Sequence, residues 1–140
     1  MSRIFWDTNL FIYLIEDFGD LSRRVVELRQ RMLERKDRLC TSTFTLGEVL
    51  VKPVEAGNET LRTQYQQAIT SGTTLIPFDQ DAAVHYARIH QDRSIRAPDA
   101  IQLACASAGG IDLFITNDER LSQKNIPGIQ FISSLERALL

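Results

Sequence analysis

Residues 96–118 read RAPDAIQLACASAGGIDLFITND and decide the class of fold. Pro98 suits the first position of a helix and Gly109-Gly110 suits its end, so this stretch predicts a helix from Pro98 to Ala108. The apolar run from Leu113 to Thr116 is too short for a helix and predicts a strand. A helix followed closely by a short apolar strand is typical of α/β folds.

Short apolar runs alternate with longer helical patterns along the rest of the chain. Four more strands are predicted, at Arg3 to Trp6, Leu39 to Thr41, Leu75 to Phe78 and Ile129 to Ile132. Helices are predicted in a short segment from Leu10 and at Leu21 to Arg38, Phe44 to Val51, Glu59 to Thr70 and Asp79 to His90. The region of Pro53 and Gly57 is interpreted as a connection between helices. This order predicts one parallel sheet with helices on both faces.

Length and composition favour a single domain over residues 1–140. The chain has 140 residues, of which 44% are hydrophobic, and this is enough for one continuous core. Its net charge of −2 gives no general attraction for nucleic acids, so a nucleic-acid site would need a local patch or a metal ion. We expect no signal peptide and no membrane span. Cys40 and Cys105 lack metal-site spacing, which favours buried free thiols and a cytoplasmic location.

Four acidic residues stand where an open α/β sheet forms its site, near the carboxyl ends of the predicted strands. They are Asp7, Glu48, Asp99 and Asp118. Each also has a local structural explanation. Asp7 and Asp118 are suited to cap the turns that follow them, and Glu48 has capping-box spacing from Thr45. Asp99 lies in a predicted first helical turn, where a negative charge complements the helix dipole.

The placement of all four acids together indicates more than local capping. Asp7 and Asp118 leave strands at their carboxyl ends, while Glu48 and Asp99 are expected in first turns of helices at the same edge, so the four can converge on one cleft. Carboxylates within a few ångströms of one another do not all stay ionised without a counter-charge. A divalent cation supplies that charge. Oxygen ligands without a Cys or His cluster favour Mg²⁺ or Mn²⁺ over Zn²⁺.

The motifs that carry these acids resemble those of the PIN domain. They are Asp7-Thr8-Asn9, Thr45-Leu46-Gly47-Glu48, Pro98-Asp99-Ala100 and Thr116-Asn117-Asp118. They follow the order of the family across residues 4–132, and within the family the chain is most similar to the VapC-like toxins of type II toxin-antitoxin systems. The runs 96–104 and 112–118 carry most of this specificity.

The resemblance implies a three-layer α/β/α sandwich whose central, mainly parallel sheet has about five strands. It also implies a Mg²⁺- or Mn²⁺-dependent endoribonuclease that forms a homodimer and has a small antitoxin protein as its partner. The metal site of the family carries over to all four acids. Asn9, Thr116 and Asn117 occupy motif positions that can orient these ligands through hydrogen bonds.

The mechanism implied for such a site is hydrolysis of RNA by water that the metal activates. We hypothesise that Asp7 and Asp99 bind the principal ion directly, while Glu48 and Asp118 complete its shell or position the attacking water. The products would carry 5′-phosphate and 3′-hydroxyl ends, because water and not the ribose 2′-hydroxyl is the nucleophile. The sequence indicates neither the number of ions nor the RNA that is cut.

Several other residues have both a functional and a structural interpretation. Residues 23–38 hold seven basic and three acidic side chains, which either guide RNA phosphates or form a solvated helix face. Arg96 is either a contact for phosphate or carboxylate at the mouth of the cleft or a surface arginine. His85 and His90 are five residues apart, which does not place two metal ligands on one helix face, so we expect them to be structural or exposed. Trp6 is expected to pack in the core.

Three other classes of protein were weighed against this interpretation. A haloacid dehalogenase-like phosphatase needs a second Asp two positions after the first, where this chain has Asn9. A receiver-type signalling domain expects an Asp after a central strand and a late Lys, and neither is convincingly placed. A non-catalytic RNA- or protein-binding module on the same fold stays open, although the filled acidic positions weigh against it.

Overall fold

The computed structural model describes residues 1–138 and 140. Its sheet has five strands in the order β3-β2-β1-β4-β5, and every pairing is parallel. The strands are β1 (Arg3–Trp6), β2 (Arg38–Ser42), β3 (Thr74–Ile76), β4 (Leu113–Thr116) and β5 (Phe131–Ser134). The predicted parallel sheet is therefore confirmed, and β1 and β4 have the bounds that the sequence predicted.

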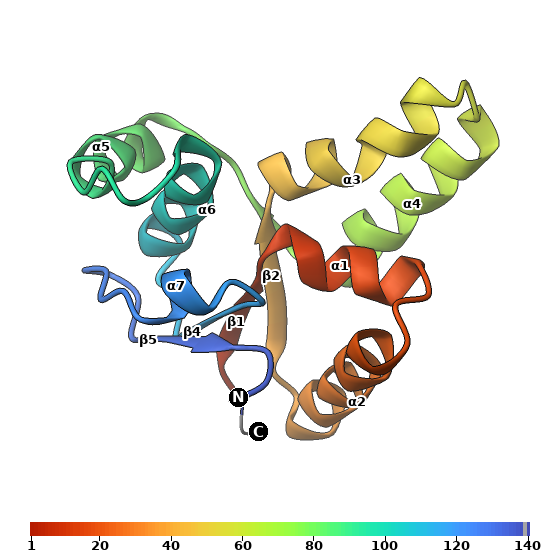
Figure 1. The fold of residues 1–140 in the computed structure, drawn as a ribbon, viewed down its shortest axis with the longest axis horizontal. Helices are drawn as coiled ribbons and strands as arrows, with labels where there is room; N and C mark the ends of the chain where they lie inside the picture. The colour runs from red at the N-terminus through yellow and green to blue at the C-terminus, as the bar shows by residue number, and fades with distance from the viewer. Residues whose placement is uncertain (139) are drawn as a thin grey trace.

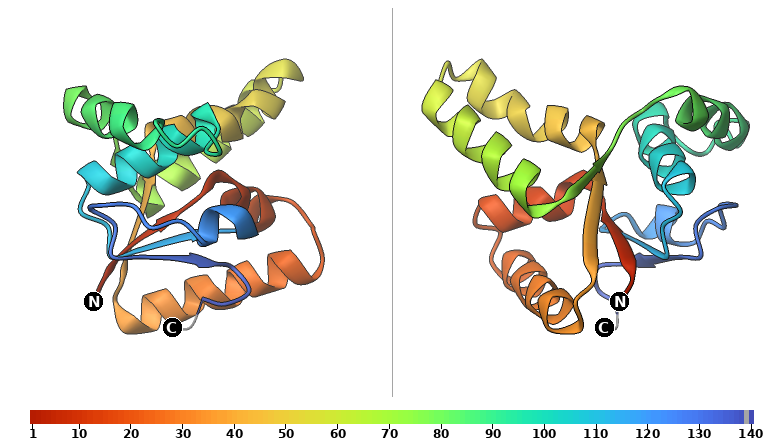
Figure 2. Two further views of the ribbon diagram at one scale, coloured as in Figure 1. Left: turned by 60° about the vertical axis from the view of Figure 1, so that its left-hand side comes forward. Right: turned by 180° about the vertical axis from the view of Figure 1, so that it is seen from behind.

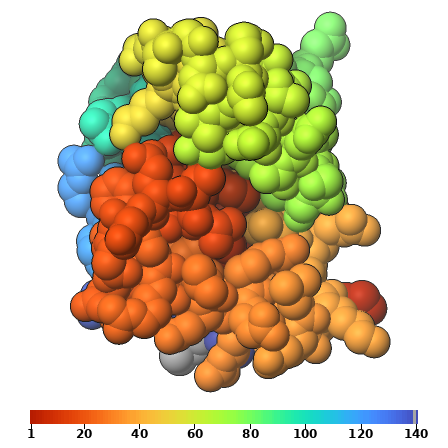
Figure 3. Space-filling view, turned by 90° about the vertical axis from the view of Figure 1, so that its right-hand side faces the viewer, coloured from red at the N-terminus to blue at the C-terminus, as the bar shows by residue number. Residues whose placement is uncertain are grey.

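Among the described residues, seven helices cover the two faces of this sheet (Figures 1 and 2). They are α1 (Thr8–Ile15), α2 (Asp20–Arg35), α3 (Thr43–Glu55), α4 (Glu59–Gly72), α5 (Gln80–Ile89), α6 (Ala97–Ala108) and α7 (Glu119–Ser122). Helices α5, α6 and α7 pack on one face, and α1 to α4 on the other. Figure 3 looks onto this second side, where α3 and α4 lie above α1 and α2. The three-layer α/β/α arrangement is confirmed.

The alternation of side chains along the strands divides the core into two layers. Phe5 of β1 faces α5 and α6 and stacks on Phe114 of β4, with ring centroids 4.9 Å apart. Ile4 and Trp6 face the opposite way, and Trp6 packs against Phe11 of α1. Trp6 is fully buried, so its predicted packing role is confirmed.

Some predicted boundaries were wrong, and backbone geometry explains the difference. The helix predicted to reach Arg38 ends at Arg35, because Lys36 adopts a left-handed conformation with φ 61°. Helix α3 continues past Val51 and through Pro53, which is buried inside the helix and does not lie in the connection. Gly57, with φ 64°, makes that connection to α4.

The outer strands also differ from the prediction. β3 stops at Ile76 because Pro77 has no backbone N–H for the ladder. β5 begins two residues later than expected, since Ile129 closes a turn by donating its N–H to the carbonyl of Ile126. The predicted free thiols, Cys40 and Cys105, are both buried. Within residues 1–138 and 140, no helix has the length and apolarity needed to cross a membrane.

Candidate active site

A cleft of about 400 Å³ opens at the carboxyl ends of β1 and β4, where the connections leave the sheet in opposite directions. The chain runs from β1 toward β2 on one side, and β4 lies on the other side of β1. In open α/β sheets such a switch point is the usual place for a site. The cleft is lined by Asp7, Thr8, Asn9, Ile12, Glu48, Arg96, Pro98, Asp99 and Gln102.

Asp7 is the most buried acid of the cleft, with 7% of its surface exposed. Its N–H donates to the carbonyl of Ile115, which extends the pairing of β1 with β4. Its carboxylate caps α1 by accepting from the N–H of Thr8 at 2.9 Å, and it accepts from the Thr116 hydroxyl at 2.8 Å. Capping and a position in the cleft are therefore compatible, and α1 begins at Thr8, earlier than the predicted Leu10.

The pKa of Asp7 is raised to about 6, mainly because burial penalises its charged form. Hydrogen bonds from Thr116 and Thr8 oppose this rise, whereas the charges of Asp99 and Glu48 add to it. The three acids that line the cleft are thus close enough to repel one another.

Asp99 lies in the first turn of α6, as predicted, and its carboxylate is 3.6 Å from the guanidinium Nε of Arg96. Burial raises the pKa of Asp99, the charge of Arg96 lowers it, and the charge of Asp118 raises it. Arg96 therefore supplies a partial counter-charge to Asp99 at the cleft, although its own side chain is 71% exposed.

Glu48 lies in the second turn of α3 and not in the first. The predicted capping box of Thr45 and Glu48 was wrong, because the helix begins at Thr43 and Ser42 is its cap, accepting from the N–H of Thr45 at 3.0 Å. The Glu48 carboxylate instead accepts a short hydrogen bond of 2.5 Å from the hydroxyl of Thr8. This bond turns Glu48 toward Asp7.

Asp118 is the one predicted acid that does not line the cleft. It caps α7 by accepting from the N–H groups of Arg120 and Leu121, and it is 3.6 Å from the Arg120 guanidinium. Its predicted capping role is confirmed. Its charge nevertheless acts on Asp99, so Asp118 lies at the margin of the acidic cluster.

The donor chemistry of this cluster suits a hard divalent cation, although a complete cage is not formed. The cleft offers carboxylate oxygens whose mutual repulsion a cation would relieve. Across residues 1–138 and 140, no three His, Cys, Asp or Glu side chains are close enough together to hold a metal ion. Arg96 lies 3.6 Å from Asp99, and Arg120 lies 3.6 Å from Asp118.

The other motif residues play unequal parts. Thr116 holds Asp7 directly, and it also accepts from the N–H of Asp118 at 3.0 Å. Asn9 lines the cleft, and its buried carbonyl oxygen has no hydrogen-bond partner among the described residues. Asn117 does not contact the acids, because its amide donates to the Tyr13 hydroxyl of α1.

Sequence reasoning missed Gln102, which is 2% exposed. Its amide donates to the hydroxyls of Thr45 and Thr8, and the amide nitrogen lies 3.4 Å from Oδ1 of Asp7. The sequence position of Gln102 could have indicated its role. Gln102 follows Asp99 by about one helical turn, inside a helix whose other buried residues are mostly small or apolar. A buried amide at such a position needs polar partners.

The two histidines have structural roles, as predicted. His90 Nδ1 lies 3.1 Å from the carbonyl of Ile95, and His85 Nδ1 lies 3.0 Å from the hydroxyl of Ser107. Neither lines the acidic cleft.

The fold and the acid-lined cleft define a PIN-type α/β domain, and the sequence profile described as PIN domain matches residues 4–127. The chain belongs to this family, which excludes the phosphatase and receiver alternatives. The protein named Ribonuclease VapC23, from Mycobacterium tuberculosis, is 28% identical over 120 residues that cover 85% of this chain and 95% of that protein.

Solved structures agree with the fold. The DNA-bound VapBC of Salmonella typhimurium has a TM-score of 0.74 at 22% identity and covers 96% of this chain and 99% of that chain. A toxin-antitoxin complex from Klebsiella pneumoniae has a TM-score of 0.63 at 25% identity and covers 90% of this chain and 94% of that chain. The family resemblance drawn from the motifs is therefore confirmed.

Proposed function

We propose that this protein is a metal-dependent endoribonuclease and the toxin of a toxin-antitoxin pair. The observation that carries the proposal is the convergence of Asp7, Glu48 and Asp99 on one cleft, where burial and like charges raise the pKa of Asp7 to about 6. Such an array is costly for folding alone and suits a site that binds a cation. The similarity to a protein named as a ribonuclease supports RNA as the substrate.

The cofactor in this proposal is Mg²⁺ or Mn²⁺. Asp7 and Asp99 bind the principal ion, and Glu48 and Asp118 complete its surroundings or position the attacking water. When bound, the cation supplies activation of water and neutralisation of the charge that develops on the scissile phosphate. Thr116 keeps Asp7 in place through the hydrogen bond to its second carboxylate oxygen.

Arg96 is proposed to bind a phosphate of the RNA. Its guanidinium side chain is 71% exposed and lies beside Asp99 at the cleft. With Asp99 engaged in holding a cation, Arg96 would be free to pair with a phosphate oxygen. Water then attacks in line with the leaving 3′-oxygen, and the products carry 5′-phosphate and 3′-hydroxyl ends.

A small antitoxin protein and a second copy of the chain are the proposed protein partners, and the cytoplasm is the proposed place of action. Similarity to VapBC and toxin-antitoxin complexes supports the antitoxin. Val51, Val54 and Phe78 are large apolar side chains that are 42–56% exposed, and they support an interface between two copies. Light scattering of the purified protein tests the dimer, and co-purification with the product of a short adjacent reading frame tests the antitoxin.

The decisive experiment incubates the purified protein with mixed RNAs in Mg²⁺, Mn²⁺ or EDTA. We expect cleavage with either cation, none with EDTA, and products that a 5′-phosphate-dependent exonuclease degrades. Asp7→Asn and Asp99→Asn, shown by circular dichroism to be folded, should not cleave. Equal cleavage by wild type and both variants would refute the site. Products with 2′,3′-cyclic phosphates would refute the mechanism, and no metal-stimulated cleavage of any RNA would favour a non-catalytic RNA- or protein-binding module.

A further inference from the structure

Gln102 lies at the centre of a buried polar network beneath the cleft. Its amide nitrogen is 2.6 Å from the Thr45 hydroxyl, 3.0 Å from the Thr8 hydroxyl and 3.4 Å from Oδ1 of Asp7. Its carbonyl oxygen accepts from the hydroxyl of Ser42. Gln102 therefore links α6 to the residues after β1 and to the start of α3, three segments that are distant in sequence.

The hydrogen bonds of this network have a defined direction. The single proton of Thr41 goes to the carbonyl of Trp6 at 2.9 Å, so the 2.8 Å bond between the Thr41 and Thr45 hydroxyls takes its proton from Thr45. Thr45 can then only accept from Gln102. On the other branch, Gln102 donates to Thr8, and Thr8 passes its own proton to Glu48. One amide thus fixes the orientation of the hydroxyl that holds Glu48.

The chemical character of Gln102 suits this place. A glutamine provides two N–H donors without a positive charge. It can therefore hold carboxylates in position without neutralising the cleft, which a lysine or arginine at the same position would do. A leucine of similar size would satisfy the packing of α6 but would leave the hydroxyls of Ser42, Thr45 and Thr8 without this partner.

We propose that Gln102 is a positioning residue for the metal site: by donating to the Thr8 hydroxyl it fixes the bond from Thr8 to one oxygen of Glu48. This inference rests on the proposed metal-dependent function. Glu48 Oε1 is committed to Thr8, and both oxygens of Asp7 accept hydrogen bonds. The network thereby sets the direction in which the carboxylates face the cleft.

The test measures Mn²⁺ affinity by isothermal titration calorimetry, with no RNA present. Gln102→Leu removes the centre of the network, and Thr8→Val removes, at a partly exposed position, the hydroxyl that bonds Glu48, Gln102 and Thr45. Thr8→Ser keeps the hydroxyl and serves as the conservative variant. Ser107→Ala is the matched control, because Ser107 is also buried in α6 but bonds Pro127 and His85, away from the cleft.

We expect Gln102→Leu and Thr8→Val each to weaken Mn²⁺ binding by about 10- to 100-fold, the usual loss when a partner of a metal ligand is removed. Thr8→Ser and Ser107→Ala should bind as the wild type does. The double variant Gln102→Leu/Thr8→Val should lose no more than the stronger single variant, since both act on one path.

Three results would overturn the inference. If Gln102→Leu and Thr8→Val bind Mn²⁺ with wild-type affinity, the network does not position the site, although metal-dependent cleavage would stand. If Ser107→Ala loses as much affinity as Gln102→Leu, the effect is one of general stability. If the wild type itself binds no Mn²⁺, the metal-dependent function fails, and this inference fails with it.

Discussion

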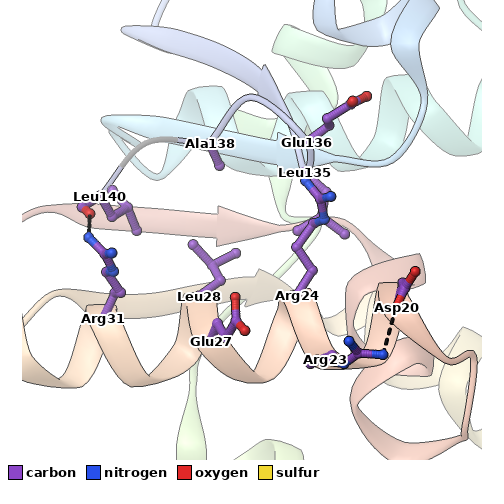
Figure 4. Close-up of a pocket in the computed structure, with 10 residues that line it drawn as sticks. All are labelled: Asp20, Arg23, Arg24, Glu27, Leu28, Arg31, Leu135, Glu136, Ala138 and Leu140. Carbon is purple, nitrogen blue, oxygen red and sulfur yellow. Dashed lines mark hydrogen bonds and ion pairs between the residues drawn. The ribbon is translucent and has the colours of Figure 1, made fainter.

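The acidic cleft and the groove along α2 both hold many charged residues, yet their charges are arranged in opposite ways. The groove is the larger, at about 580 Å³, and lies between α2 and the C-terminal segment (Figure 4). Its lining has three basic and three acidic side chains, Arg23, Arg24, Arg31, Asp20, Glu27 and Glu136. The Arg23–Asp20 pair is solvated, since its two side chains are 69% and 85% exposed. In the cleft, by contrast, like charges lie together and partly buried.

The number of charged residues in a region therefore does not by itself indicate a functional site. Exposed pairs of opposite charge are screened by water and contribute little. Buried like charges raise one another's pKa, and proteins keep such arrangements mainly where they bind an ion or perform chemistry. The basic excess of residues 23–38 is therefore interpreted as a solvated helix face.

The largest expected effect is on catalysis by the cleft acids. Asp7→Asn should lower RNA cleavage in Mn²⁺ by more than the roughly 10- to 100-fold typical of residues that only support metal ligands. Asp20→Asn, in the groove, should cleave at the wild-type rate because its carboxylate is exposed. Initial rates on one RNA measure both. A similar loss of cleavage in the two variants would contradict the assignment of catalysis to the cleft and not to the groove.

The contribution of α2 to stability should come from the side chains on its buried face. Met32 is fully buried, so Met32→Ala should lower the free energy of unfolding by about 2–5 kcal/mol. Val26 lies on the same helix and is 55% exposed, so Val26→Ala should change it by no more than about 0.5 kcal/mol. Urea denaturation followed by circular dichroism measures both. Equal losses would contradict the assignment of the buried face of α2.

Burial of Asp7 should make the metal-free protein less stable as the pH rises. Its pKa is raised from 3.8 to about 6, so the folded state favours the protonated carboxyl. The resulting contribution to the free energy of unfolding is fully present below pH 3.8 and is lost as the pH rises through about 6. The difference between the two pKa values corresponds to about 3 kcal/mol.

The measurement compares wild type with Asp7→Asn in EDTA by urea denaturation between about pH 4 and pH 8. The variant should gain stability relative to the wild type as the pH rises through this window. A difference that does not change with pH would show that the Asp7 carboxylate is not destabilised by its surroundings.

The smallest expected effect concerns the salt dependence of RNA binding. If Arg96 contacts one phosphate, Arg96→Ala should reduce the slope of log affinity against log salt concentration by about 0.7. Arg24→Ala, in the groove, should leave the slope unchanged. Fluorescence anisotropy with an inactive Asp7→Asn protein in each background measures the slopes. A reduced slope for Arg24→Ala would indicate that the basic helix α2 contacts RNA phosphates.

Local patterns were sufficient for most of the fold. β1 and β4 were located correctly because each is a short apolar run that is followed directly by polar residues. The boundaries of α3 were harder to predict from the sequence. Ser42, Thr43 and Thr45 all offer a hydroxyl for the cap, and only the position of the chain after β2 selects Ser42. Pro53 is read as a helix breaker, yet the packing of α3 against α4 carries the helix past it.

The candidate site was likewise predictable from the sequence only in part. The sequence alone determined which acids follow which strands and helices, because order and spacing fix the sheet edge at which they emerge. Asp118 caps α7 through the N–H groups of Arg120 and Leu121, which are close in sequence, so this role was predictable. The orientation of Glu48 was decided by the tertiary structure, because its hydrogen-bond partner Thr8 becomes a neighbour only after folding. Gln102 depends on contacts between three distant segments, which no local pattern specifies.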